Sequence, residues 1–367
     1  MKFTVICGCS EKMQVFEIPM HHVRLCTSLL SERREISREQ ILLPMESVIE
    51  KGGAFLSIPI LSIYVATYNH EQYIVQALDS ILMQETKYSY EVLVGEDCST
   101  DNTRAVLKAY EQQHPGRFTI FYRDHNMHRE PVRNGMDLKL RCRGKYIIAL
   151  EGDDYWTDPH KIEKQIDFLE SHPEYIAVSH NCIVVDHESR PKDEMYPECK
   201  EETYTFHHYV SDILPGQLTT VMYRNAFIDP QYDASLLHKR LTSGDRAIYF
   251  WLLVNGKIHC MQECMSAYRH VTDRGSSYSA TCRYCFEDYH MLYSSMLQYA
   301  RKRNHSQGIR FARHLLFRNL LQGFKEGQCT ESDFRKRFDE VDSKLYVLME
   351  YVIYRIRRYT LRLKFWL

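Results

Sequence analysis

Residues 144–159 read Gly-Lys-Tyr-Ile-Ile-Ala-Leu-Glu-Gly-Asp-Asp-Tyr-Trp-Thr-Asp-Pro, a short apolar segment that runs directly into three carboxylates. The apolar part, Tyr146–Leu150, is continuous instead of alternating, which predicts a central strand covered on both faces. Glu151, Asp153 and Asp154 then lie at its carboxyl end. Ligands of open α/β sheets collect beyond the carboxyl ends of the strands, and clustered hard oxygens suit a divalent cation that bridges substrate phosphates. The stretch therefore predicts a ligand site with a cation at this edge.

A polar turn that caps the next helix is the alternative explanation for these acids. Asp158, directly before Pro159, fits that capping role for a helix that continues to about Glu170. Asp153 and Asp154 are left without a capping task, so the sequence favours the site. The loop position of Asp154 also predicts an exposed side chain that contributes little to stability.

The composition of the 367-residue chain is that of an ordinary globular protein, with 44% hydrophobic and 26% charged residues. The length allows one large domain or one domain with an appendage. A net charge of −1 gives no reason to expect nucleic acid as a partner. We find no apolar run of about eighteen residues and no signal peptide, so we expect a cytoplasmic protein.

The twelve cysteines have scattered spacings, which in a chain of this length predicts free thiols. Two close pairs, Cys260 with Cys264 and Cys282 with Cys285, have a spacing that zinc sites use. The first pair falls in a predicted strand and the second in a helix-like aromatic run. Scattered buried thiols are therefore the preferred interpretation.

Strands and helices alternate in the pattern between residues 60 and 141. Strands are expected at 60–66, 90–95 and 118–123, and helices at 73–83, 102–113 and 132–141. Such alternation implies right-handed crossovers and a mostly parallel, Rossmann-like α/β sheet with helices on both faces. Neither Gly-x-Gly-x-x-Gly after the first strand nor a Gly-Lys-Ser/Thr phosphate loop occurs, which disfavours a dehydrogenase or a P-loop enzyme.

Polar and acidic residues follow three of the expected strands. The loops carry Tyr68-Asn69, Glu96-Asp97 and Glu151-Gly152-Asp153-Asp154. Such an edge would repel phosphates unless a cation lay between them, so a metal-bound nucleotide is the simplest ligand.

The second half of the chain is less regular. Strands are expected at 175–185, 219–224 and 257–268, and an apolar helix at 245–255. Asp245 opens that helix, where an acid is either an N-cap or, if the helix points at the ligand, a general base. The pattern alone favours the cap.

Both ends of the chain fall outside the α/β pattern. Residues 1–56 have no clear period and form an N-terminal extension of uncertain order. Residues 57–285 form the main domain, and residues 286–367 a helical, basic C-terminal region. Residues 343–367 place apolar side chains beside arginines, which fits either a helix at the membrane surface or a terminal helix packed on the domain.

The chain resembles the family 2 glycosyltransferases with the GT-A fold, particularly bacterial enzymes of capsule and lipopolysaccharide assembly. The resemblance is dense from about Leu61 to Asp186. It rests on Ala-Thr-Tyr-Asn-His at 66–70, Gly-Glu-Asp-Cys-Ser-Thr-Asp-Asn-Thr at 95–103 and the stretch 144–156. A looser match continues through 220–224, 244–245 and 268–270, and together these motifs are specific.

The resemblance implies a role for each matching residue. Binding of the nucleotide sugar would fall to Thr67, Tyr68, Asn69, Glu96, Asp97, Asp153, Arg269 and His270. Asp154 and Glu151 would bind the metal, Mg²⁺ or Mn²⁺, and Asp245 would be the general base. Glu96 is a departure, because many relatives have aspartate at that place.

The implied activity is transfer of a sugar from a nucleoside diphosphate sugar, such as a UDP-sugar, to a hydroxyl of a glycan or a lipid-linked acceptor in surface polysaccharide synthesis. Inversion at the anomeric carbon is expected. Two alternatives stay open: a sugar nucleotidyltransferase, which would be expected to bring a Gly-rich basic loop after the first strand, and a non-catalytic nucleotide-binding relative. A membrane-bound C-terminal helix would put the protein on the inner face of the cell membrane.

Overall fold

The computed structural model describes residues 2–9, 12–19, 50–51, 54–55, 58–271 and 283–339. The chain divides into two compact units, Met1–Ser57 and Ile58–Leu367. In the first unit, β1 (Lys2–Cys9) pairs antiparallel with β2 (Lys12–Pro19), and β3 (Glu50–Lys51) with β4 (Ala54–Phe55). The three-part division at residues 56 and 285 stays a prediction, and the helix expected at 343–367 lies outside the described residues.

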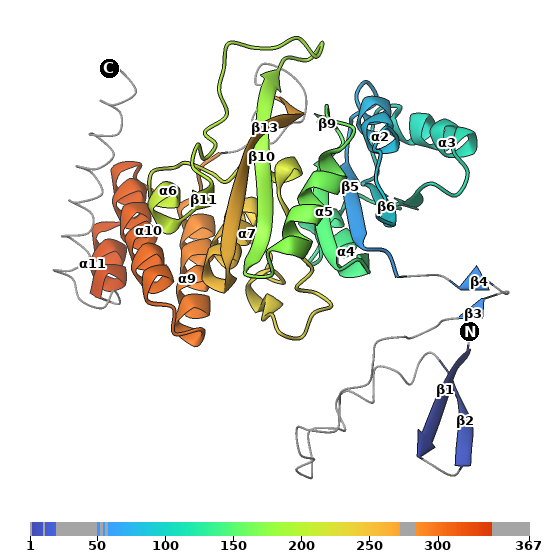
Figure 1. Ribbon diagram of the computed structural model, residues 1–367. Coiled ribbons are helices and arrows are strands. Elements are labelled where there is room, and N and C mark those ends of the chain that lie inside the picture. The colour runs from blue at the N-terminus through green and yellow to red at the C-terminus, as the bar shows by residue number, and fades with distance from the viewer. Residues whose placement is uncertain are drawn as a thin grey trace. The chain divides into compact units, whose positions relative to one another are not determined.

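The second unit is built on one nine-stranded sheet (Figure 1). Its strands are β5 (Leu61–Thr67), β6 (Tyr90–Glu96), β7 (Thr119–Tyr122), β8 (Tyr146–Glu151), β9 (Tyr155–Trp156), β10 (Tyr175–Val185), β11 (Thr203–Tyr204), β12 (Met222–Arg224) and β13 (Lys257–Arg269). Their order across the sheet is β11-β13-β10-β12-β8-β5-β6-β7, with β9 pairing to β13.

The sheet is parallel through β8, β5, β6 and β7, as the alternating pattern predicts. β10 and β13 are also parallel, whereas β12 runs antiparallel between β10 and β8. A mostly parallel α/β sheet flanked by helices is therefore confirmed. The strand expected at 219–224 is shorter than predicted, because Leu218–Thr220 forms a 3₁₀ turn, η3, before β12.

Helices pack on both faces of the sheet (Figure 1). The helices of the described part of this unit are α2 (Ile74–Leu82), α3 (Thr103–Gln113), α4 (Asn134–Arg141), α5 (Lys161–Ser171), α6 (Phe206–Val210), α7 (Gly244–Asn255), α9 (Phe286–Lys302), α10 (Ser306–Lys325) and α11 (Glu331–Asp339), with further 3₁₀ turns η2 (Met127–Arg129) and η4 (Ala234–Leu236). α11 packs on α10 instead of the sheet. One core contains α2, α3 and α5, and the other contains α4, α7, α9 and α10.

Strand β8 shows why its apolar run is continuous. Tyr146, Ile148 and Leu150 belong to the core with α2, α3 and α5, while Ile147 and Ala149 belong to the core on the other face. All five are at most 2% exposed. Burial of a large apolar side chain contributes roughly 1.5–3 kcal/mol, so the strand is a firm support for the acids at its end. In the described part of the chain, no helix has both the length and the apolar character needed to cross a membrane.

Candidate active site

The carboxyl ends of β5, β6 and β8 meet at one edge of the sheet. The register pairs Thr67 with Glu96 and Ala66 with Glu151, which brings the three predicted loops together. The Asp97 N–H donates to the Thr67 carbonyl at 3.0 Å, and the Gly152 N–H donates to the Ala66 carbonyl at 3.0 Å. The loops are thus tied to one another by backbone hydrogen bonds, because parallel strands end on the same side.

The loop after β5 lies directly over the acidic loop. Thr67 Oγ1 is 3.3 Å from His70 Nδ1, and His70 Nε2 is 3.7 Å from Asp153 Oδ2. Gly152 lies directly against these two side chains. A Cβ at residue 152 would come within 2.8 Å of both Thr67 Oγ1 and His70 Nδ1. The absence of a side chain at residue 152 is what allows the two loops to approach.

Gly152→Ala should therefore push the β5 loop away from the acidic loop. We expect a loss of about 1–3 kcal/mol in the free energy of unfolding, as for other overpacked positions, together with weaker nucleotide binding. The matched control is Gly135→Ala in α4, where an added Cβ meets nothing within 4 Å. Urea unfolding of both variants decides the matter, and equal stability of the two would refute the close approach.

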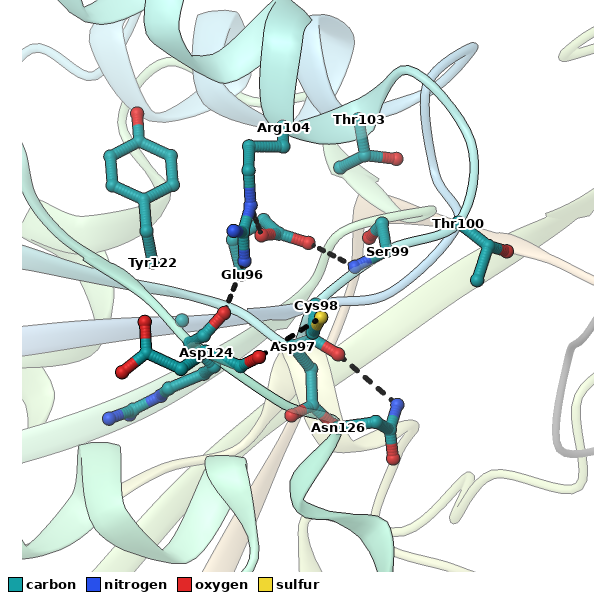
Figure 2. A network of polar contacts seen from close by, with 12 residues as sticks. Glu96, Asp97, Cys98, Ser99, Thr100, Thr103, Arg104, Tyr122, Asp124 and Asn126 are labelled. Carbon is teal, nitrogen blue, oxygen red and sulfur yellow. Dashed lines mark hydrogen bonds and ion pairs between the residues drawn. The ribbon is translucent and has the colours of Figure 1, made fainter.

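The loop after β6 is held from within by Glu96, as Figure 2 shows. The Glu96 side chain is fully buried. Its Oε1 accepts the Ser99 N–H at 2.6 Å, and its Oε2 forms an ion pair with Arg104, which also donates to the Arg123 carbonyl. Both oxygens of Glu96 are thus bonded inside the protein, so its contact with a nucleoside stays a prediction.

Asp97 and Asn69 fix the neighbouring turns. Asp97 Oδ1 accepts the Met127 N–H at 2.8 Å. Burial raises the pKa of Asp97, and the hydrogen bond from Met127 partly offsets this rise. Asn69 adopts the left-handed conformation at φ 57°, and its Oδ1 accepts the Thr100 N–H at 2.8 Å. Asn69 therefore joins the β5 and β6 loops, and Tyr68 beside it is half-buried.

Asp154 is buried, with 2% of its surface exposed, so the prediction of an exposed side chain is wrong. Its Oδ2 accepts from Gln217 Nε2 at 2.9 Å, and its Oδ1 accepts from the Arg269 N–H at 2.8 Å. The loop turns Asp154 inward against η3 and β13, an orientation that no local sequence pattern predicts. Burial, with Asp153 nearby, raises the pKa of Asp154 well above its ordinary value.

Asp245 lies within electrostatic reach of Glu151. Burial, followed by the charge of Asp153, raises the pKa of Glu151 to about 7; Lys139 opposes this shift and Asp245 adds to it. Asp245 lies in the first turn of α7, and Ser243 Oγ donates to its Oδ1 at 2.7 Å. The N-cap is Ser243, so the capping interpretation of Asp245 is wrong. Lys139, in α4, is a charged neighbour of Glu151, and no sequence motif marks it as part of the site.

Glu151→Gln should stabilise the metal-free protein at high pH. Glu151 has an ordinary pKa of 4.5 in the unfolded chain and a pKa raised to about 7 in the folded one, so the folded state holds an extra proton between these values and loses stability as pH rises through them. The glutamine variant avoids this loss. We expect it to gain roughly 3 kcal/mol over the parent above pH 7 and nothing below pH 4.5, measured by urea unfolding in a chelator. A gain that does not depend on pH would contradict the assignment.

Arg269 and His270, at the end of β13, contact the protein itself. The Arg269 side chain is buried, and its guanidinium donates to the carbonyls of Asp153 and Asp186 and to two side-chain oxygens. Direct contact with a diphosphate would require some of these bonds to break. His270 Nδ1 lies 2.6 Å from Glu194 Oε1. Binding of the nucleotide sugar by either residue stays a prediction.

The residues that could hold a cation are Asp154 and Glu151. Within the described ranges, no group of three or more His, Cys, Asp or Glu side chains is arranged to hold a metal ion. Cys260, Cys264 and Cys285 are free thiols, and Cys282 of the alternative zinc site lies outside those ranges. One or two carboxylates suit Mg²⁺ that keeps waters and bridges substrate phosphates, and each carboxylate oxygen of Asp154 retains a lone pair. The acids therefore fit a cation that arrives with its nucleotide.

Sequence relatives match more than half of the chain. An uncharacterized protein of Mycobacterium tuberculosis is 31% identical over 215 residues, 57% of this chain and 58% of that protein. The protein named as the teichuronic acid biosynthesis glycosyltransferase TuaG of Bacillus subtilis is 28% identical over 222 residues, 60% of this chain and 82% of its own length. The chain thus spans little more than half the length of the mycobacterial relative.

The fold has a counterpart among solved structures. TarS 1–349 of S. aureus, in complex with UDP-GlcNAc, is similar with a TM-score of 0.51 and 18% identity, over 80% of this chain and 79% of that one. Residues 62–235, which contain the β5, β6 and β8 loops, match the family Glycosyl transferase family 2. The matched residues are therefore similar to glycosyltransferase family 2, and the fold is similar to the GT-A fold of TarS.

Proposed function

We propose that the chain transfers a sugar from a nucleoside diphosphate sugar, in the first instance a UDP-sugar, to a hydroxyl of a glycan or lipid-linked acceptor in surface polysaccharide synthesis. The observation that carries the proposal is the row of acids at the end of β8, within electrostatic reach of Asp245. The name of TuaG supports the pathway, and the UDP-GlcNAc complex of TarS supports the class of donor.

Asp154 and Glu151 would hold Mg²⁺ or Mn²⁺ together with the diphosphate. When bound, the cation neutralises negative charge on the leaving diphosphate. The protein's part is to hold the two carboxylates in place, Glu151 at the end of β8 and Asp154 in the loop that follows. Because fewer than three protein ligands are available in the described part, we expect the metal to bind weakly without nucleotide.

Asp245 would act as the general base. The acceptor oxygen attacks the anomeric carbon while the bond from that carbon to the diphosphate oxygen breaks, and its electron pair leaves with the nucleoside diphosphate. The acceptor proton passes to the Asp245 carboxylate. A single displacement of this kind inverts the anomeric configuration. Ser243 Oγ, bonded to Asp245 Oδ1, orients the carboxylate.

A panel of nucleotide sugars tests this function. The full chain is incubated with UDP-, GDP- and dTDP-sugars, with and without Mn²⁺, and the release of nucleoside diphosphate is measured. We expect metal-dependent release from one nucleotide class. Release of pyrophosphate from a sugar phosphate and a nucleoside triphosphate would instead indicate a nucleotidyltransferase, and binding without release from any donor would indicate a non-catalytic relative.

A further inference from the structure

Gln217 is placed to control the orientation of Asp154. It lies at the start of η3 with 6% of its surface exposed. Its Oε1 accepts the Thr219 N–H at 2.6 Å, so its Nε2 must be the atom that donates to Asp154 Oδ2 at 2.9 Å. The backbone N–H thereby fixes which end of the amide faces the carboxylate.

The turn that carries Gln217 is held from two other elements. Trp156 Nε1, in β9, donates to the Thr219 carbonyl at 3.2 Å. Gln165 Nε2, in α5, donates to the Thr220 carbonyl at 2.8 Å. Thr219 and Thr220 are both almost fully buried. The support behind Gln217 is therefore rigid and shielded from water.

The other oxygen of Asp154 is held from β13. The Arg269 N–H donates to Oδ1 at 2.8 Å. The Arg269 guanidinium donates to the Asp153 carbonyl at 2.8 Å and the Asp186 carbonyl at 2.7 Å, and it lies 4.2 Å from the ring centroid of Tyr73. These contacts hold the end of β13, and with it the N–H that meets Asp154.

We propose that Gln217 and Arg269 are positioning residues that hold Asp154 in one orientation, so that cation and diphosphate meet a preformed ligand. The proposal rests on the proposed function, since it concerns the same carboxylate. Groups that orient a metal-binding side chain are typically worth about 10–100-fold in metal affinity or activity. Both residues act through Asp154 and need not touch the substrate.

Gln217→Met removes the amide at nearly constant volume. We expect the affinity for UDP with Mn²⁺, measured by calorimetry, and kcat to fall by about 10–100-fold, while KM for the acceptor is unchanged. The matched control is Gln84→Met, because Gln84 is also buried and bonds the Asp158 carbonyl at 2.8 Å and the Ile162 N–H at 3.1 Å, away from Asp154. Parental affinity and kcat in Gln217→Met, or equal losses in Gln84→Met, would overturn the proposal.

Arg269→Lys keeps the positive charge but cannot make all the bonds of the guanidinium. It should weaken binding of UDP with Mn²⁺ in the same direction as Gln217→Met. Parental affinity in this variant would remove Arg269 from the proposal.

A double-mutant cycle in urea separates this proposal from the proposed function. Gln217→Met and Asp154→Asn are measured singly and together, without nucleotide. We expect the effects on the unfolding equilibrium constant to be non-additive by roughly tenfold, since the two side chains are in direct contact. Additive effects would overturn the contact. If the parent does not bind nucleotide, the proposed function is overturned. The cycle would still show whether Gln217 and Asp154 interact, because it is measured without nucleotide.

Discussion

Asp245→Asn is expected to lower the rate of sugar transfer by about 10²–10⁴ while the chain still binds nucleotide and metal almost as tightly as the parent. A general base removes the acceptor proton and has no part in holding the donor. The asparagine Oδ1 can still accept from Ser243 Oγ, so the first turn of α7 keeps its contact. Single-turnover transfer, measured beside calorimetry of UDP binding, checks both halves of the expectation.

Asp288→Asn is the matched control for Asp245. Asp288 is also an acid in the first turn of a helix, α9, but it is exposed and lies outside the three loops at the sheet edge. Transfer by this variant should equal that of the parent. If Asp245→Asn also keeps parental transfer, Asp245 is an ordinary first-turn acid; if binding and transfer both collapse, it supports the structure of the site.

Asp154→Asn should lower transfer by about 10²–10³ and also destabilise the fold by about 1–3 kcal/mol. The stability loss follows from burial, because the new amide group would place a donor against either Gln217 Nε2 or the Arg269 N–H. The loss of transfer follows from the missing negative charge at the cation. Metal titrations of transfer and urea unfolding measure the two effects separately.

Asp158→Asn provides the comparison for Asp154. Asp158 lies four residues further along the chain. It accepts the His160 N–H at 2.7 Å and forms an ion pair with Lys164 at 2.8 Å, and these contacts stabilise the start of α5. We expect a modest loss of stability and no change in metal dependence. Near-parental turnover by Asp154→Asn, with the same response to metal, would be incompatible with its role as the ligand.

The sequence was sufficient for the parts of the fold that follow from local patterns. The unbroken apolar run Tyr146–Leu150 predicted a strand buried on both faces, and both cores share it. The alternation of strands and helices predicted that the loops carrying Thr67, Glu96 and Asp153 would meet at one edge. These inferences hold because period and strand direction are properties of short segments.

The inward orientation of Asp154 could not be read from the sequence. Gln217 is 63 positions away, two residues before the strand expected at 219–224, and nothing in its surroundings marks a carboxylate partner. Arg269 reads as a cation available to a diphosphate, yet its guanidinium faces the interior. Glu96 reads as a nucleoside ligand and forms an ion pair with Arg104. Each case depends on tertiary contacts that no local pattern encodes.

Calorimetric titration of UDP into the full chain, with and without Mn²⁺, tests most directly whether the acids at the end of β8 form a metal-nucleotide site. Mn²⁺ alone is titrated as a reference. We expect weak binding of either component by itself, binding of UDP that tightens by at least about tenfold with Mn²⁺, and loss of that tightening in Asp154→Asn. Equal affinity for UDP with and without Mn²⁺ in the parent would contradict the assignment of the site.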